Sequence, residues 1–293
     1  MGKDGNRNLL NEQFGLNMNK LLTLFAVIVL IMMNAGCKKD DDNPASGDDG
    51  VTEDGWKLVW SDEFKYSGLP DSTKWTYQVG GSGWGNNELQ YYTSKRLENT
   101  FVTDDVLVIK AIKESYNGNE YTSARLNTAV NWKYGKFEIR ARLPQGKGTW
   151  PAIWMMPASS NYGNWPSSGE IDIMEHVGYD PNVIHASIHC DAYNHIKGTQ
   201  KTATVTMPDV LNSYHVYGLE WNADSMFATI DGARYFTFKN EKAGWQKWPF
   251  DQEFYIILNI AVGGNWGGAQ GVDPNIWPQQ MEIDYVRVYQ KVE

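Results

Sequence analysis

The chain has 293 residues, of which 42% are hydrophobic and 21% charged, which is enough apolar content for a sizeable core and too little charge for a largely disordered chain. Its formal net charge of −9 argues against nucleic acid or an anionic polymer as partner, because phosphate and sulfate backbones are normally met by a basic surface. A neutral partner fits this balance better. The 13 Trp and 16 Tyr offer faces that stack on flat surfaces such as sugar rings, although large β-sandwich cores are also rich in aromatic residues.

The N-terminus is predicted to be a secretory signal. An apolar run over 21–33 follows a positively charged start and is too short for a lasting membrane span. It ends at Ala35–Cys37, which resembles the lipobox of bacterial lipoproteins, in which the cysteine is lipidated and becomes the new N-terminus. Asn34 departs from that pattern, so plain cleavage is the alternative. We therefore assign 1–37 to the signal, with translation starting at Met18.

The next segment, 38–54, is polar and acidic and is predicted to be a flexible linker. Its acidic run resembles the surface-export signals of some outer-membrane lipoproteins, with a simple spacer as the alternative. A lipidated Cys37 would be the chain's single membrane contact, anchoring an exported protein at the outer membrane or cell surface; without it the protein would be secreted. The other cysteine, Cys190, has no disulfide partner in the mature chain, and we expect a monomer.

The body of the chain, 55–293, is predicted to be all-β. In Lys136–Leu143 apolar and charged residues alternate, as on a half-buried antiparallel strand. Asp231-Gly232 separates two short apolar runs and predicts a hairpin with a tight turn. Phe254–Val262 and Met281–Tyr289 read as further strands. Many strands punctuated by Gly- and Asn-rich loops predict a sandwich or jelly roll of two curved antiparallel sheets, whose concave face the loops wall into an open cleft.

Three carboxylates lie within six residues, at Glu170, Asp172 and Glu175. The two isoleucines between them and the flanking glycines favour a short strand, on which Glu170 and Asp172 share one face. Strict alternation would bury Glu175 in the core, which is costly, whereas a β-bulge near Met174 returns it to the face of the other two. The sequence thus predicts a bulged strand with three acids on the concave surface.

Carboxylates held this close cannot all be ionised, so their pKa values split and leave one nucleophile and one proton donor. Retaining glycoside hydrolysis needs that pair at about 5–5.5 Å. We assign Glu170 as nucleophile and Glu175 as acid/base, with Asp172 hydrogen-bonded to Glu170. Taken alone the spacing is a weak signal, because short acidic strings are common on solvated edge strands.

The wider sequence resembles glycoside hydrolase family 16 of the laminarinase type. The resemblance spans nearly the whole mature domain, in order, and is carried by WSDEF (60–64), WGNNELQYYT (84–93), YGKFEIRAR (134–142), GTWPAIWMMP (148–157), GEIDIMEH (169–176), ILNIAVGGNW (257–266) and DYVRVY (284–289). Each string is modestly specific, and their ordered combination is very specific. The resemblance implies a β-jelly roll and an endo-acting, retaining enzyme that cleaves β-1,3-glucan (laminarin) or mixed-linkage β-1,3-1,4-glucan. Its Glu-x-Asp-x-x-Glu motif maps onto Glu170, Asp172 and Glu175 without gaps.

The resemblance also implies residues that bind the sugar chain, each with core packing or an ordinary surface contact as the alternative. Tryptophans would line the cleft near the cut bond, Asn86 and Arg125 would hold sugar hydroxyls on the non-reducing side, His189 would reach the acids, and a Gly-rich loop would form a wall. The expected residues are Trp150, Trp154, Asn86, Arg125, His189, Asn265, Trp266 and Trp84.

No cofactor is expected for catalysis, since the carboxylates carry the chemistry. The family resemblance implies a structural Ca²⁺ away from the cleft, with Glu63 and Asp284 as oxygen ligands and a backbone carbonyl near Asp105. Ordinary edge charges are the alternative at Glu63 and Asp284.

Three alternatives remain open at this point. A family 16 galactanase acting on agar, carrageenan or porphyran would want basic residues in its groove, and the acidic balance speaks against it. A noncatalytic carbohydrate-binding protein on the same fold usually loses one of the acids, and both glutamates are present here. A transglycosylase shares the same double displacement, and the sequence leaves it open, as it does the linkage preference.

Overall fold

The computed structural model describes residues 51, 52 and 54–292. The predicted signal, its Cys37 and most of the predicted linker lie outside these residues. Val51 forms an antiparallel bridge with Lys57, and the Thr52 backbone N–H donates to the Trp56 carbonyl. The first described residues therefore pair with the start of the first strand. No helix within the described residues is long and apolar enough to cross a membrane.

The described residues form seventeen strands and no helix, as the period-two apolar pattern predicts. In chain order they are β1 (Trp56–Asp62), β2 (Trp75–Tyr77), β3 (Gln90–Tyr92), β4 (Thr100–Thr103), β5 (Val106–Tyr116), β6 (Asn119–Ser123), β7 (Arg125–Thr128), β8 (Gly135–Arg142), β9 (Thr149–Pro157), β10 (Glu170–Glu175), β11 (Val183–His189), β12 (Lys201–Thr206), β13 (His215–Trp221), β14 (Ser225–Ile230), β15 (Ala233–Lys239), β16 (Phe254–Val262) and β17 (Gln279–Lys291).

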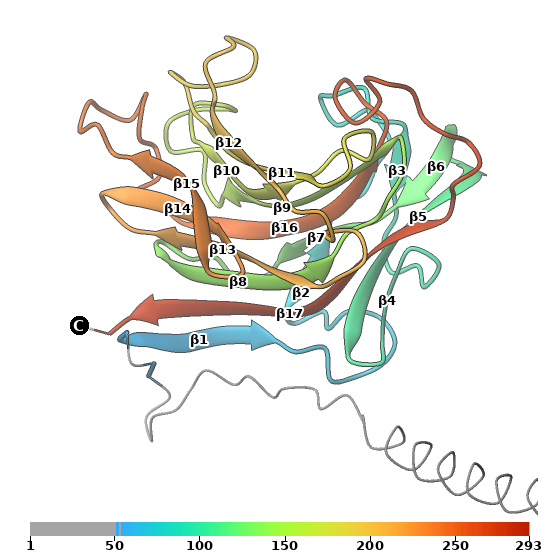
Figure 1. The fold of residues 1–293 in the computed structure, drawn as a ribbon, viewed down its shortest axis with the longest axis horizontal. Helices are drawn as coiled ribbons and strands as arrows, with labels where there is room; N and C mark the ends of the chain where they lie inside the picture. The colour runs from blue at the N-terminus through green and yellow to red at the C-terminus, as the bar shows by residue number, and fades with distance from the viewer. Residues whose placement is uncertain (1–50, 53, 293) are drawn as a thin grey trace, which may run out of the picture. The chain divides into compact units, whose positions relative to one another are not determined.

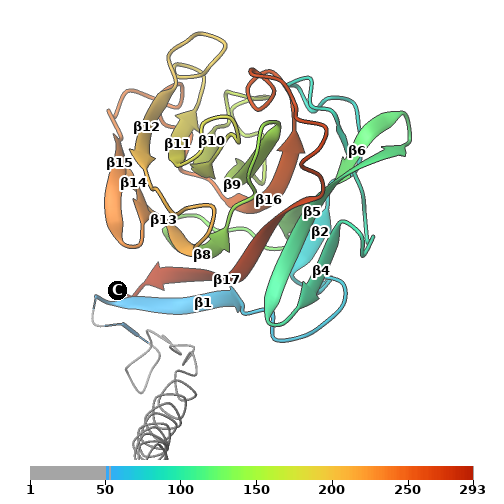
Figure 2. The same cartoon turned by 45° about the vertical axis from the view of Figure 1, so that its right-hand side comes forward.

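Two curved sheets lie face to face (Figure 1). The larger has the order β15-β14-β13-β8-β17-β5-β6-β3, with β1 paired to β17 and β4 to β5. The smaller has the order β12-β11-β10-β9-β16-β7-β2 and, in the turned view, lies on the side from which the long loops rise (Figure 2). The expected all-β jelly roll is therefore confirmed.

The core lies between the two sheets. On β8 the side chains of Phe137, Ile139 and Ala141 are fully buried, as the alternation predicts. The predicted hairpin joins β14 to β15, and both turn residues have positive φ, 49° at Asp231 and 77° at Gly232, as a tight two-residue turn requires. Burial of this apolar face fixes the register of the strands, because a slip of one residue would expose it.

The outer face of the smaller sheet carries the polar side chains. On β16, Ile256, Leu258 and Ile260 point into the core, while Asn259 and Ala261 line a pocket on the opposite face. Antiparallel pairing aligns these positions across the sheet, since directly opposed residues share a face. The fold thus sets rows of side chains that run across the strands on the concave surface.

Candidate active site

A bulge in β10 brings all three acids to the concave face. Asp172 pairs with Trp154 on β9, and Met174 pairs with Ile153, so β10 has one residue more than β9 between these points. The same irregularity separates Asp172 from Glu175 along β11. On the inner side of β10, the core contains the packed side chains of Ile171, Ile173 and Met174. The predicted bulged strand is confirmed, and it serves to keep Glu175 out of the core.

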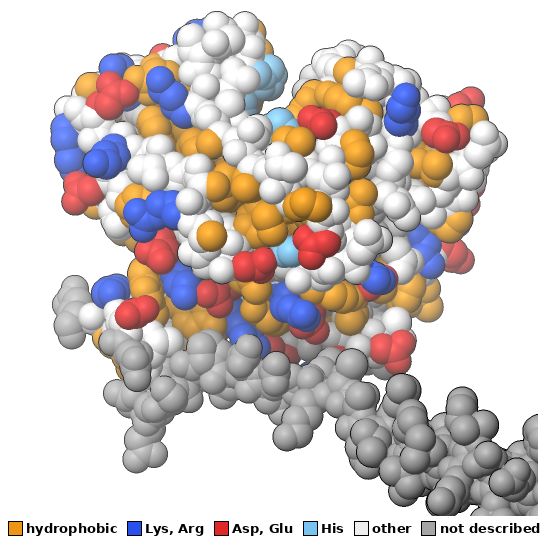
Figure 3. All heavy atoms as spheres, in the orientation of Figure 1, with side chains coloured by type: hydrophobic (Ala, Val, Ile, Leu, Met, Phe, Trp, Pro, Cys, Tyr) orange, Lys and Arg blue, Asp and Glu red, His pale blue; other side chains and the backbone are white. Residues whose placement is uncertain are grey.

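The three acids lie in a cavity of about 380 Å³, a size typical of small-molecule sites. Figure 3 shows the surface hollowed between two raised lobes. Five of the eight predicted binding residues line this cavity together with the acids, namely Trp84, Asn86, Arg125, Trp150 and Trp154. The other three, His189, Asn265 and Trp266, contact its lining residues from beside it.

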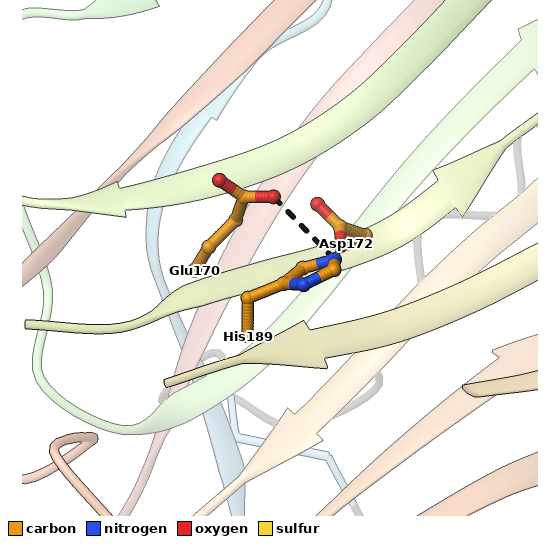
Figure 4. A group of neighbouring side chains, drawn as sticks. All are labelled: Glu170, Asp172 and His189. Atoms are coloured by element: carbon orange, nitrogen blue, oxygen red, sulfur yellow. Dashed lines mark ion pairs between the residues drawn. The ribbon is translucent and has the colours of Figure 1, made fainter. Parts of the chain in front are cut away.

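His189 on β11 faces two of the acids (Figure 4). Its Nε2 lies 3.3 Å from Oδ2 of Asp172 and 3.7 Å from Oε1 of Glu170. Both partners are shielded, with side-chain exposures of 3% for Asp172 and 16% for Glu170. The imidazole therefore lies between the two carboxylates.

Burial sets the ionisation of the three acids. Burial and, after it, the Asp172 charge raise the pKa of Glu170, while His189 and the Trp165 hydrogen bond lower it, and the balance lies at about 8. Burial also raises the pKa of Asp172 to about 8, against a hydrogen bond with Glu170 that lowers it. For Glu175, burial and then the charges of Asp172 and Glu170 raise the pKa well above its usual value. All three carboxyl groups therefore hold a proton to higher pH than an exposed acid does.

Two indoles hold the outer carboxylates. Nε1 of Trp165 donates to Oε2 of Glu170 at 2.7 Å, and Nε1 of Trp150 donates to Oε1 of Glu175 at 3.1 Å. Trp154, the other predicted cleft tryptophan, instead donates to Oδ1 of Asn259 at 2.7 Å. Its indole N–H is therefore used within the cleft floor, and its ring contacts the Arg125 guanidinium.

Arg125 on β7 lies between two tryptophan rings. Its guanidinium carbon is 4.7 Å from the ring centroid of Trp84 and 4.6 Å from that of Trp154, and 9% of the residue is exposed. Burial lowers the pKa of Arg125, while the neighbouring Tyr92 and Glu88 raise it. A flat, weakly hydrated cation fixed between two aromatic faces is a rigid hydrogen-bond donor at this end of the cleft.

The Gly-rich loop after β16 forms part of the wall. Oδ1 of Asn265 accepts from Nδ2 of Asn87 at 2.8 Å, and the Asn265 backbone N–H donates to the Asn86 carbonyl at 2.7 Å. Trp266 packs edge-on against Trp150, with ring centroids 5.4 Å apart, and against His185 at 4.9 Å. These two residues support the cavity from outside its lining and tie the two loops together.

The comparisons with known proteins agree with this geometry. The model of glycosyl hydrolases family 16 matches residues 84–287. This chain belongs to glycosyl hydrolases family 16.

The match with its relatives in this family covers most of the length of those proteins. A protein named beta-glucanase from Rhodothermus marinus is 56% identical over 247 residues, covering 81% of this chain and 86% of that protein. A glucan endo-1,3-beta-glucosidase from Cryptopygus antarcticus is 43% identical over 248 residues, covering 79% and 91%. The solved laminarinase from Rhodothermus marinus superposes with a TM-score of 0.80 at 56% identity, covering 81% of this chain and 98% of that one.

Several lining residues of this family 16 cleft were not singled out from the sequence. Asn259 is a lone polar residue in the apolar run of β16, a signal that could have marked it. Glu88, which accepts from Gln90 at 2.6 Å, follows Asn86 in the quoted string. His195 and Ile196 lie in an irregular loop after β11, where no periodicity marks a residue as facing the cleft.

One cluster in the described residues has the residue types of a metal site. Among the described residues, one group of His and acid side chains brings its ligand atoms within 4.8 Å of one another, and it is Glu170, Asp172 and His189. A metal held there would occupy the carboxylate that family 16 chemistry needs free, so we assign these three residues to the acid network. The side chains predicted for calcium are engaged elsewhere: Arg287 donates twice to Glu63, and Arg140 pairs with Asp284 at 2.5 Å.

Proposed function

We propose that this protein is a retaining endo-β-1,3(4)-glucanase that cleaves β-glucan by double displacement with Glu170 and Glu175. The observation that carries the proposal is the bulged strand β10, which sets two glutamates on one face of a cavity, where burial and the neighbouring charges raise the pKa of both. Family membership and the printed names of its relatives favour β-1,3-glucan as the polymer.

In the first step, a carboxylate oxygen of Glu170 forms a bond to the anomeric carbon while Glu175 gives its proton to the departing glycosidic oxygen. Trp165 orients Glu170 and favours its charged form, because its N–H donates to the carboxylate. In the second step, Glu175 takes a proton from water, the water oxygen attacks the anomeric carbon, and the bond to Glu170 breaks. Glu175 thus changes from acid to base between the steps.

The charges of Asp172 and His189 shift the pKa of Glu170: Asp172 raises it and His189 lowers it. Once Glu170 is covalently bound, its charge is gone, and the pKa of Glu175 falls because one of the like charges that raised it has disappeared. That fall turns Glu175 into a base when the second step needs one. The buried row of three acids therefore couples the two steps electrostatically.

Product analysis tests the activity. The domain from residue 50 onward would be incubated with laminarin, lichenan and agarose, with Glu170→Gln and Glu175→Gln as controls. We expect oligosaccharides from laminarin and a loss of at least about 100-fold in both variants. Cleavage of agarose alone would move the substrate to a galactan, and binding without cleavage of any polymer would contradict the enzyme.

Azide rescue separates the roles of the two glutamates on a substrate with an aryl leaving group. In Glu170→Ala, azide attacks from the vacated side and gives a glycosyl azide of inverted, α configuration. In Glu175→Ala, the covalent intermediate still forms, and azide replaces water to give the β configuration. Exchanged configurations would reverse our assignment of nucleophile and acid.

We further propose that Cys37 is lipidated and that the protein is exported and anchored at the outer membrane or cell surface. The support is the Ala35–Cys37 string after an apolar run, both outside the described residues. Membrane fractionation of the full chain tests this: we expect it in the membrane fraction, and Cys37→Ala in the soluble fraction. Equal distribution of the two would contradict the anchor.

A structural calcium ion stays a prediction. Carboxylate and carbonyl oxygens suit Ca²⁺, but binding through Glu63 and Asp284 would have to displace Arg287 and Arg140 from their ion pairs. The side chains as they stand do not fit the ion without that rearrangement, and no catalytic step depends on it. A calcium-dependent rise in melting temperature that Asp284→Asn abolishes would support the site, and no change would contradict it.

A further inference from the structure

The ring of Trp266 connects the two strands that flank the acid strand. It is nearly perpendicular to the ring of Trp150 on β9, with centroids 5.4 Å apart, and to the ring of His185 on β11, at 4.9 Å. β9 and β11 both pair with β10, and His185 lies directly opposite Glu175. Trp266 therefore joins the neighbours of β10 at the end of that strand where Glu175 lies.

Two glycines of the same loop fit closely against Trp150. A Cβ atom on Gly267 would lie 2.7 Å from Cβ of Trp150, and one on Gly264 would lie 3.4 Å from its Cζ3. A side chain at Gly267 would therefore collide with Trp150 unless the loop moved. Because glycine lets a backbone approach this closely, the loop packs on the indole with no side chain between them.

The loop is held by backbone hydrogen bonds on two sides. The Gly263 N–H donates to the carbonyl of Gly148, the residue just before β9, at 2.8 Å. The Asn265 N–H donates to the Asn86 carbonyl at 2.7 Å. The loop is thus fixed to the start of the strand that carries Trp150 and to the opposite loop, so it can serve as a rigid support.

Trp150 lines the cavity and donates through Nε1 to Oε1 of Glu175 at 3.1 Å, whereas Trp266 lies outside the lining. We propose that Trp266, together with Gly264 and Gly267, is a positioning element for the general acid: it fixes the indole of Trp150 and, through that indole, the carboxyl group of Glu175. This inference rests on the proposed function. It differs from the sugar-binding wall that the family resemblance implies for Trp266.

A displaced Glu175 would impair one identifiable part of the reaction. A poor leaving group departs only as its oxygen receives the proton of Glu175, whereas a strongly acidic phenol departs as its anion without that proton. The bond from Glu170 to the anomeric carbon forms in both cases. Loss of position at Glu175 therefore slows the first step for poor leaving groups and spares it for good ones.

Two aryl β-laminaribiosides that differ in their leaving group test this. In Gly267→Ala and in Trp266→Ala, we expect kcat/KM on the methoxyphenyl substrate to fall about 10- to 100-fold, a part of what general acid catalysis contributes, and to stay within about 3-fold on the dinitrophenyl substrate. Trp266→Phe keeps a ring between Trp150 and His185 and should restore most of the methoxyphenyl activity.

Gly268→Ala is the matched control. A Cβ atom there would lie 2.7 Å from the carbonyl oxygen of Gly264, much as one on Gly267 would lie 2.6 Å from that of Gly263, but its nearest neighbours would all be backbone atoms of the loop. It should leave the ratio of the two kcat/KM values unchanged. Equal losses on both substrates in Gly267→Ala and Trp266→Ala, or no loss on either, would overturn the proposal.

A double-mutant cycle tests whether Trp266 acts through Trp150. Once Trp150→Phe has removed the indole N–H, adding Trp266→Ala should bring little further loss on the methoxyphenyl substrate, because the bond to Glu175 is already gone. Losses that simply multiply would show that Trp266 acts by another route. Cleavage of the dinitrophenyl substrate by the unaltered protein tests the proposed function by itself, so the two failures are distinguishable.

Discussion

Nε1 of Trp165 donates a 2.7 Å hydrogen bond to Oε2 of Glu170, the carboxylate that we assign as nucleophile. Trp150 makes the corresponding bond to Glu175 at 3.1 Å. Each glutamate is thus oriented by an indole, Glu170 by Trp165 in the loop that leads into β10 and Glu175 by Trp150 on β9. Since an N–H bond to a carboxylate favours its charged form, each indole also lowers the pKa of its partner.

Replacing one indole at a time should move one limb of the pH profile. In Trp165→Phe the ring stays but the donor is lost, so the pKa of Glu170 rises and the acidic limb of kcat/KM moves to higher pH. We expect kcat/KM to fall about 10- to 100-fold, the range for a hydrogen bond to a charged group. Trp150→Phe should instead move the basic limb to higher pH. Profiles in which neither limb moves would contradict these two contacts.

Asp172→Asn should shift the whole profile to lower pH. The Asp172 charge raises the pKa of both Glu170 and Glu175, so its removal lowers both. His189→Gln is the opposite test, because the His189 charge lowers the pKa of the same two groups, and its loss should shift the profile upwards. The measurement is kcat/KM against pH on an aryl β-laminaribioside. Shifts in the same direction for both variants would contradict the assigned charges.

Much of this site could be predicted from the sequence because its signals are local. The three acids, two isoleucines and flanking glycines of β10 lie within ten residues, 169–178, so the bulge followed from the cost of burying Glu175. Likewise, alternation on β8 and the Asp231-Gly232 turn are decided by neighbours in the chain. Long-range pairing was less accessible: nothing near His185 indicates that it lies opposite Glu175 on the neighbouring strand.

The ion pairs between residues far apart in the chain could not be predicted from the sequence either. Glu63 and Asp284 were predicted as calcium ligands from the family resemblance, whereas the structure shows each paired with an arginine. Arg140 on β8 meets Asp284 on β17 through the register of those two strands, and Arg287 on β17 meets Glu63 through the pairing of β17 with β1. Ion pairs of this kind follow from sheet register, which a single sequence does not specify.

The acids that perform catalysis should also cost stability. An acid whose folded pKa is raised binds its proton more tightly when folded, so the free energy of unfolding falls as pH rises from about 4.5, the unfolded value, to about 8 for Glu170. Glu170→Gln removes this titration. We expect the variant to melt higher than the unaltered protein at pH 8, by roughly 2–4 °C per kcal/mol in a domain of this size, and to show no gain at pH 4. An equal gain at both values would assign the effect to packing instead.

Arg125 should act through stacking as well as charge. Arg125→Lys keeps the charge but loses the flat guanidinium that lies between Trp84 and Trp154. A desolvated cation–π contact contributes about 2 kcal/mol to holding the side chain in place. Since Arg125 is predicted to hold sugar hydroxyls away from the cut bond, we expect its displacement to raise KM roughly 10- to 30-fold, with a smaller change in kcat. Arg234→Lys is the matched control: Arg234 also lies over an aromatic ring, that of Phe227, but it is exposed on the other sheet, and its replacement should leave KM unchanged. A fall in kcat at constant KM would place Arg125 at the reacting carbon rather than on the non-reducing side.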